Sequence, residues 1–185
     1  MLNNVNSNFL NFKRISLQLQ LNLRTRMHLI KLKNFVLLIL PLLLILSSCN
    51  KDSLDPEKQA QQDEAIIVKF LTDKNITAQR HSSGVYYQII NPGAGNITFS
   101  LNTTVSAKYT GRLLSGSEFD KSIQPISFKL GGVIAGWQIG VPLIQKGGKI
   151  RLFIPSGLGY GSGGSGPIPA NAVLDFDIEL VDVTN

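Results

Sequence analysis

The stretch that decides the fold is residues 131–141, Gly-Gly-Val-Ile-Ala-Gly-Trp-Gln-Ile-Gly-Val, which contains the only tryptophan of the chain. Apolar residues recur at helical spacing at Ile134, Trp137 and Val141, and Ile144 just beyond the stretch continues the pattern. This pattern predicts a short helix with one buried face, after a turn made by the two glycines. A helix this short is not stable alone. Strand-like segments flank it at 125–130 and 149–155, so the stretch predicts a helix held against a sheet.

Strand patterns dominate the chain from Gly84 onward. The predicted strands are residues 85–90, 104–113, 125–130, 149–154 and 173–183. The last strand alternates most clearly, with Leu174, Phe176, Ile178 and Leu180 facing inward and Asp175, Asp177 and Glu179 facing solvent. The strand at 149–154 sets Ile150, Leu152 and Ile154 against Lys149, Arg151 and Phe153. Clean alternation is typical of an antiparallel sheet with one solvated face, so we expect an α+β domain of about 100 residues.

The positive charge of the chain lies outside this domain. Residues 1–48 hold 6 of the 18 basic residues and none of the 12 acidic ones, so the rest of the chain carries 12 of each sign. No basic patch remains once this segment is set aside, so we expect no nucleic-acid partner. All 17 glycines fall between Gly84 and Gly166, which places the start of the domain near Ser82.

Cysteine and histidine are scarce. The single cysteine, Cys49, excludes an internal disulfide framework and a multi-cysteine metal site. The two histidines, His28 and His81, lie outside residues 82–185, so no Ser/His/Asp or Cys/His catalytic group is expected inside the domain.

The N-terminal segment has the features of a secretory signal. A basic stretch that begins at Met27, which is interpreted as the true start, precedes the apolar run 35–46 and two serines. Twelve helical residues span only about 18 Å, against about 30 Å of bilayer hydrocarbon, so a transmembrane helix is disfavoured. Residues 46–49, Leu-Ser-Ser-Cys, resemble the lipobox of bacterial lipoproteins, which implies that 1–48 is a lipoprotein signal peptide and that Cys49 carries lipid. A plain signal peptide followed by an ordinary cysteine is the alternative.

A polar tether is expected at 49–62, followed by a helical segment at 63–81. Ile66, Ile67, Phe70 and Leu71 fit one helical face. Asp63 and Glu64 favour the N-terminal end of such a helix. The helix is interpreted as a docking or dimer contact, or as a cover for the domain.

Six motifs in order carry a family resemblance. They are 105–111 (Val-Ser-Ala-Lys-Tyr-Thr-Gly), 116–120 (Gly-Ser-Glu-Phe-Asp), 133–137 (Val-Ile-Ala-Gly-Trp), 158–161 (Leu-Gly-Tyr-Gly), 168–169 (Ile-Pro) and 174–180 (Leu-Asp-Phe-Asp-Ile-Glu-Leu). Together they resemble the FKBP-type peptidyl-prolyl cis-trans isomerases, over residues 84–183. The resemblance implies an antiparallel sheet of five to six strands wrapped around a short helix, and rotation of X–Pro bonds in proline-containing polypeptides of the cell envelope.

The resemblance also implies a site. Its catalytic residues are Asp120, Tyr160, Ile134 and Trp137, and its substrate-binding residues are Tyr109, Phe119, Ile126, Val133, Ile168 and Phe176. No cofactor or metal is expected. Two features depart from the family: the short loop expected at 121–124 holds no arginine to pair with Asp120, and Ile126 stands where an aromatic residue is common. The glycine-rich segment 157–166, called the flap below, lacks the Lys-Ser/Thr ending of a phosphate loop.

One other function remains open, and a second is disfavoured. The same pocket in a non-catalytic peptide-binding or chaperone lipoprotein would hold client chains without isomerising them. A purely structural envelope lipoprotein gives no reason for the pocket residues to occur together. Taken one at a time, Trp137, Phe119, Phe176 and Tyr109 are each most simply core residues.

Overall fold

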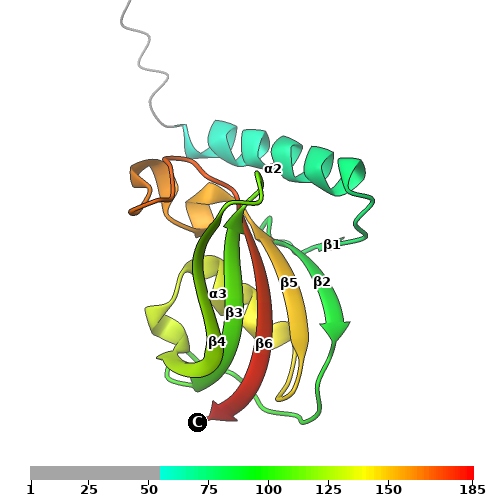
Figure 1. Ribbon diagram of the computed structural model, residues 1–185, viewed down its shortest axis with the longest axis vertical. Coiled ribbons are helices and arrows are strands. Elements are labelled where there is room, and N and C mark those ends of the chain that lie inside the picture. Colours follow the sequence, from blue (N-terminus) through cyan, green and yellow to red (C-terminus); the bar gives the residue numbers. More distant parts are fainter. Residues whose placement is uncertain (1–54) are drawn as a thin grey trace, which may run out of the picture. The chain divides into compact units, whose positions relative to one another are not determined.

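An antiparallel sheet of six strands carries the fold in the computed structural model, which describes residues 55–185 (Figure 1). The strand order is β1-β2-β5-β6-β3-β4. The strands are β1 (Gln79–Arg80), β2 (Tyr86–Asn91), β3 (Thr104–Leu113), β4 (Glu118–Lys129), β5 (Lys149–Ile154) and β6 (Leu174–Thr184). Two α-helices, α2 (Pro56–Asp73) and α3 (Ala135–Gly140), accompany them, with four 3-10 turns: η1 (Leu130–Gly132), η2 (Val141–Leu143), η3 (Ser156–Leu158) and η4 (Gly161–Gly163).

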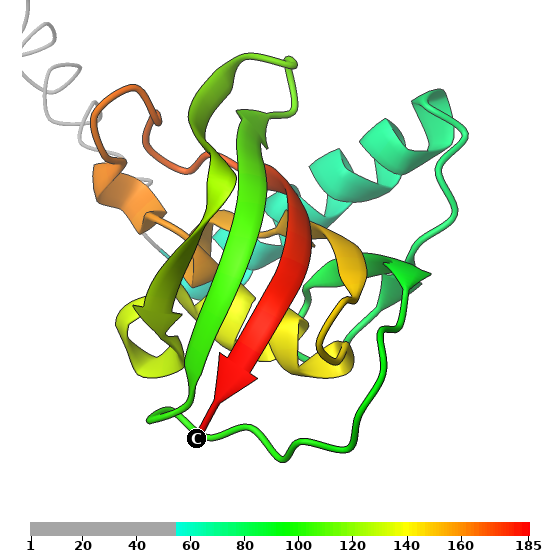
Figure 2. The same cartoon turned by 60° about the horizontal axis from the view of Figure 1, so that its bottom comes forward.

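The sheet curves around α3, as Figures 1 and 2 show from two directions. A Cβ atom at Gly136 would lie 2.4 Å from Ile154, and one at Gly140 would lie 2.5 Å from Leu152. These two glycines, one helical turn apart, therefore let α3 lie directly on β5. Trp137, Val141 and Ile144 are buried beneath the sheet, as the helical spacing predicted. The expected α+β fold, with an antiparallel sheet around a short helix, is confirmed.

Strand β4 is longer than expected. It begins at Glu118 and includes residues 121–124, where a short loop was expected. Its pairing with β3 shifts register between Ala107 and Tyr109, so that Ile126 and Ser122 become their partners. Pro125 lies within this shift, on a strand at the edge of the sheet. Proline is tolerated at such positions because its nitrogen has no hydrogen to donate and an edge strand does not require that bond.

Helix α2 begins at Pro56, seven residues before the expected start at Asp63. The Asp55 side chain accepts a hydrogen bond from the Glu57 amide (3.0 Å), and proline is favoured in the first helical turn. Pro56 is thus part of a helix start, and residues 56–62 are helical where a tether was expected. Asp63 consequently lies inside the helix and is fully buried.

The outer face of the sheet is covered at one end by α2. Ile67 and Leu71 form a second apolar cluster with Tyr86, Phe153 and Val173. Phe153 was expected on the solvent side of β5, but it is fully buried because α2 covers it. The described residues 55–185 belong to one compact unit. The predicted signal peptide and Cys49 lie outside the described residues.

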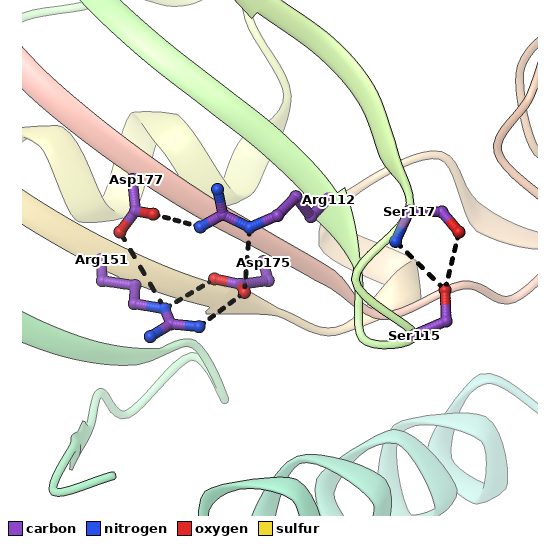
Figure 3. Close-up of polar contacts among 6 residues, drawn as sticks. All are labelled: Arg112, Ser115, Ser117, Arg151, Asp175 and Asp177. Carbon is purple, nitrogen blue, oxygen red and sulfur yellow. Dashed lines mark hydrogen bonds and ion pairs between the residues drawn. The ribbon is translucent and has the colours of Figure 1, made fainter. Parts of the chain in front are cut away.

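Beyond α2 the outer face carries an ion-pair network (Figure 3). Asp175, expected to face solvent, is only 3% exposed because two arginines enclose it. Arg151 binds it through two nitrogens at 2.9 and 2.8 Å, which raises the pKa of this arginine. Arg112 approaches Asp175 to 3.7 Å and donates to Asp177. The network joins β3, β6 and β5 side by side.

Within residues 55–185, no helix is both long and apolar enough to cross a bilayer.

Candidate active site

A pocket of about 280 Å³ opens between α3, the flap and strands β3, β4 and β6. It is called the aromatic pocket here. Its lining residues are Tyr109, Asp120, Phe128, Gly132, Val133, Ile134, Trp137, Tyr160 and Phe176. Five of these nine residues are aromatic, so the pocket suits a small apolar ring.

Trp137 sits among three rings set at steep angles to its own. The centroid distances and interplanar angles are 5.2 Å and 85° to Tyr109, 5.8 Å and 79° to Phe128, and 5.4 Å and 86° to Phe176. Edge-to-face pairs at these distances are the favourable aromatic geometry. Trp137 is 4% exposed, and its indole nitrogen has no partner among the described residues. The rings thus hold the indole rigidly as one side of the pocket.

Asp120 is held by the tyrosine beside it. The Tyr109 hydroxyl donates to Asp120 Oδ2 at 2.7 Å, and the Lys121 amide donates to Oδ1 at 2.8 Å. Burial, and then the bond to Asp120, raises the pKa of Tyr109. Burial, and then the charge of Asp120, raises the pKa of Tyr160. Both tyrosines therefore keep their hydroxyl protons at neutral pH, and Tyr109 holds Asp120 although residues 121–124 contain no arginine.

The turn before α3 presents a backbone donor. Gln138 Nε2 donates to the Val133 carbonyl at 2.8 Å, and the Ile134 carbonyl accepts from the Trp137 amide at 2.9 Å. These bonds fix the turn against the helix. Within the described part of the chain, the Ile134 amide nitrogen donates no hydrogen bond. This N–H therefore remains available at the edge of the aromatic pocket.

The structure brings together seven of the ten residues predicted for the site. They are Asp120, Tyr160, Ile134, Trp137, Tyr109, Val133 and Phe176. Of the other three, Phe119 packs edge-to-face behind Phe176 with ring centroids 5.5 Å apart, Ile126 is 38% exposed on β4, and Ile168 is buried in the main core. None of the three lines the pocket.

Phe128 and Gly132 line the pocket and were not predicted. Phe128 lies two residues beyond Ile126 on the same strand, and residues two apart share a face of a strand. Its contact with Trp137 supplies an aromatic wall on the side where Ile126 was expected to leave a thin one. The two-residue periodicity of a strand, counted from Ile126, would have predicted that Phe128 also faces the pocket.

Among residues 55–185, no group of three His, Cys, Asp or Glu side chains is placed to hold a metal ion.

Residues 95–181 match the family described as FKBP-type peptidyl-prolyl cis-trans isomerase. The isomerase FkpA of Buchnera aphidicola (from Schizaphis graminum) is 43% identical over 127 residues, which cover 67% of this chain and 50% of that protein. The chain spans about half the length of the curated relatives it matches.

Two solved structures are similar to this fold. FkpA from Escherichia coli has a TM-score of 0.60 at 41% identity, covering 69% of this chain and 62% of that one. A peptidyl-prolyl cis-trans isomerase from Pseudomonas syringae has a TM-score of 0.59 at 31% identity, covering 72% of this chain and 98% of that one. Both the ordered pocket residues and these likenesses lead to one conclusion: the chain belongs to the FKBP-type peptidyl-prolyl cis-trans isomerase family.

Proposed function

We propose that the chain is a peptidyl-prolyl cis-trans isomerase that acts on X–Pro bonds of exported or envelope polypeptides. The observation that carries the proposal is the aromatic pocket, in which Trp137 is enclosed by three rings with the bonded Tyr109–Asp120 pair at its edge. Such a pocket accepts a proline ring on the indole and leaves the polar backbone of the substrate at the rim.

The chemistry suits a pocket without a nucleophile. Rotation about a peptide bond meets a barrier of about 18–20 kcal/mol, because resonance gives the C–N bond partial double-bond character. That resonance makes the planar amide more polar than the twisted one. A dry aromatic site therefore favours the twisted amide, and preferential binding of the twisted state lowers the barrier. The reaction requires no cofactor.

Each pocket residue has a role in this proposal. Trp137 carries the proline ring, and Tyr109, Val133 and Phe176 wall it in, together with Phe128. The Ile134 amide and the Tyr160 hydroxyl donate to substrate carbonyl oxygens, which the protonated state of Tyr160 permits. Asp120, fixed by Tyr109, faces the twisting amide. Phe119 supports Phe176 from behind.

The test is the rate of cis-to-trans conversion of an X–Pro tetrapeptide by the full chain in detergent. Trp137→Ala and Asp120→Ala are each expected to lower kcat/KM at least about tenfold, because each removes a contact to the bound proline or amide. Asp182→Ala, an exposed acid on the outer face, is the control and should retain the wild-type rate. A folded wild-type chain with no activity would reject the enzyme and leave a peptide-binding or chaperone lipoprotein.

We further propose that lipid on Cys49 anchors the protein to a membrane, with the domain facing the periplasm. The apolar run 35–46 followed by Leu-Ser-Ser-Cys supports this. Expression of the full chain in Escherichia coli with labelled palmitate is expected to label the wild type and not Cys49→Ala, and only the wild type should sediment with membranes. Equal labelling of both chains would overturn the anchor while leaving the isomerase proposal intact.

A further inference from the structure

A buried carboxylate lies outside the aromatic pocket. Asp63, in the middle of α2, has no exposed surface. Its Oδ1 accepts from Gln59 Nε2 at 2.8 Å. Its Oδ2 accepts from the backbone N–H of Ser156 at 2.7 Å and from the Ser156 hydroxyl at 2.6 Å. Burial of a carboxylate is costly unless donors surround it, so these three bonds hold Asp63 and Ser156 firmly together.

Ser156 is the residue before the flap and the first residue of η3. The turn that follows is tight, because Leu158 N donates to Pro155 O at 2.9 Å and Gly159 N donates to Ser156 O at 3.0 Å. Tyr160 comes next and lines the aromatic pocket. A displacement at Ser156 is therefore carried through one 3-10 turn to the Tyr160 ring.

The rest of this junction is loosely filled. A cavity of about 490 Å³ separates the first turns of α2 from the flap, and Pro56, Ala60, Gly157 and Gly161 are among its lining residues. The apolar residues of α2, Ile67 and Leu71, pack on the sheet. The bonds from Asp63 consequently carry much of the connection between α2 and the start of the flap.

We propose that Asp63 is a positioning residue for the isomerase site: through Ser156 it sets where the flap holds Tyr160. The proposal rests on the proposed function for its effect on rate. Its structural half, the coupling of Asp63 to Tyr160, is independent of any activity. Helix α2 is by this inference part of the active-site framework.

The first measurement is a mutant cycle on kcat/KM in the full chain. Asp63→Ala is expected to lower kcat/KM about tenfold, because a small misplacement of a substrate contact is enough for such a loss. On a Tyr160→Phe background the same change should cost nothing further, since the hydroxyl it positions is already absent. Independent, multiplicative losses would overturn the coupling.

Asp63→Asn is the conservative variant. Its amide oxygen still accepts from Ser156, and its NH₂ is satisfied when the Gln59 amide turns to present its oxygen. It should therefore restore the wild-type rate. Leu71→Ala is the matched control on the same helix: it should lower the melting temperature without changing kcat/KM at a temperature where the chain is folded. If Leu71→Ala lowered kcat/KM as much as Asp63→Ala does, Asp63 would stabilise the fold only, and the positioning proposal would be wrong.

The second measurement needs no activity. Side-chain NMR of the four tyrosines should show the Tyr160 ring resonances shifted in Asp63→Ala and unshifted in Asp63→Asn and Leu71→Ala, with Tyr87 constant in all. If the wild type is inactive but Tyr160 shifts in this pattern, the isomerase proposal fails and the positioning stands. If Tyr160 does not respond to Asp63→Ala, the positioning is wrong whatever the activity.

Discussion

The two faces of the sheet are covered in different ways. The inner face receives α3, which lies between β4 and β5 in the chain and brings Trp137 with it. The outer face receives α2, which precedes all six strands of the described chain, and α2 covers only the end near Phe153. Beyond α2 the outer face carries the ion pairs of Arg112 and Arg151 with Asp175. The inner face thus depends on neighbours in the sequence, and the outer face on a distant helix and on charge pairing.

The largest expected effect on stability comes from removing α2, which covers one end of the outer face. A chain shortened to begin at Ser82 loses the burial of Ile67 and Leu71 and exposes Phe153. Each buried aliphatic side chain contributes about 1.5–3 kcal/mol, so we expect the free energy of unfolding in urea to fall by about 4 kcal/mol or more. A chain beginning at Asn50 is the control. Equal urea midpoints would show that the outer face needs no cover.

Leu152 and Phe153 are neighbours on β5 and belong to the apolar clusters of opposite faces of the sheet. Phe153→Ala and Leu152→Ala should each cost about 3–4 kcal/mol, since both side chains are fully buried. Combined with Ile67→Ala, the Phe153 change should cost less than the sum, because both residues belong to the cluster under α2. The costs of Leu152→Ala and Ile67→Ala should be additive in the double variant. Additivity of both pairs in urea unfolding would mean that α2 and Phe153 do not support each other.

The charged part of the outer face is expected to contribute less. Asp175→Asn leaves Arg151 and Arg112 without their shared carboxylate in a partly buried site, and should cost about 2 kcal/mol. The exposed pair Lys146–Asp182 provides the matched control, and Asp182→Asn should change the urea midpoint little. A larger loss from Asp182→Asn than from Asp175→Asn would contradict the difference in burial.

The smallest effect concerns Glu64 on α2. Hydrogen bonds from Arg80 and Tyr86 lower its pKa from the ordinary value of 4.5. Its folded pKa lies below its unfolded one, so its contribution is present above about pH 4.5 and is lost as the pH falls through the lowered value. Glu64→Gln should therefore be slightly less stable than wild type at pH 7, and this difference in stability should shrink as the pH falls below about 4.5. A difference that grows toward acid would have the wrong sign.

The inner face was predictable because its signals are local. Helical spacing around Trp137 and alternation in β5 and β6 identified the inward-facing residues, and Trp137, Leu152 and Phe176 are buried among them. The motif resemblance found seven pocket residues, and missed Phe128 because it followed the family position onto Ile126.

The outer face was predicted poorly because its partners are far apart in the chain. Asp63 is buried and bonded to Ser156, 93 residues away, and no sequence pattern within α2 predicts that bond. Asp175 alternates like a solvent-facing acid, yet two arginines on neighbouring strands bury it. The start of α2 at Pro56 is the exception, because its cap from Asp55 is local and was an available helix-start signal within the expected tether.

The single tryptophan has a practical consequence. Because Trp137 is the only indole among 185 residues and lines the aromatic pocket, the tryptophan fluorescence of the whole chain originates at the proposed proline site. Ligand titration and unfolding can both be followed as emission from that one residue, without any label. The protein carries its own optical reporter at the position where substrate would bind.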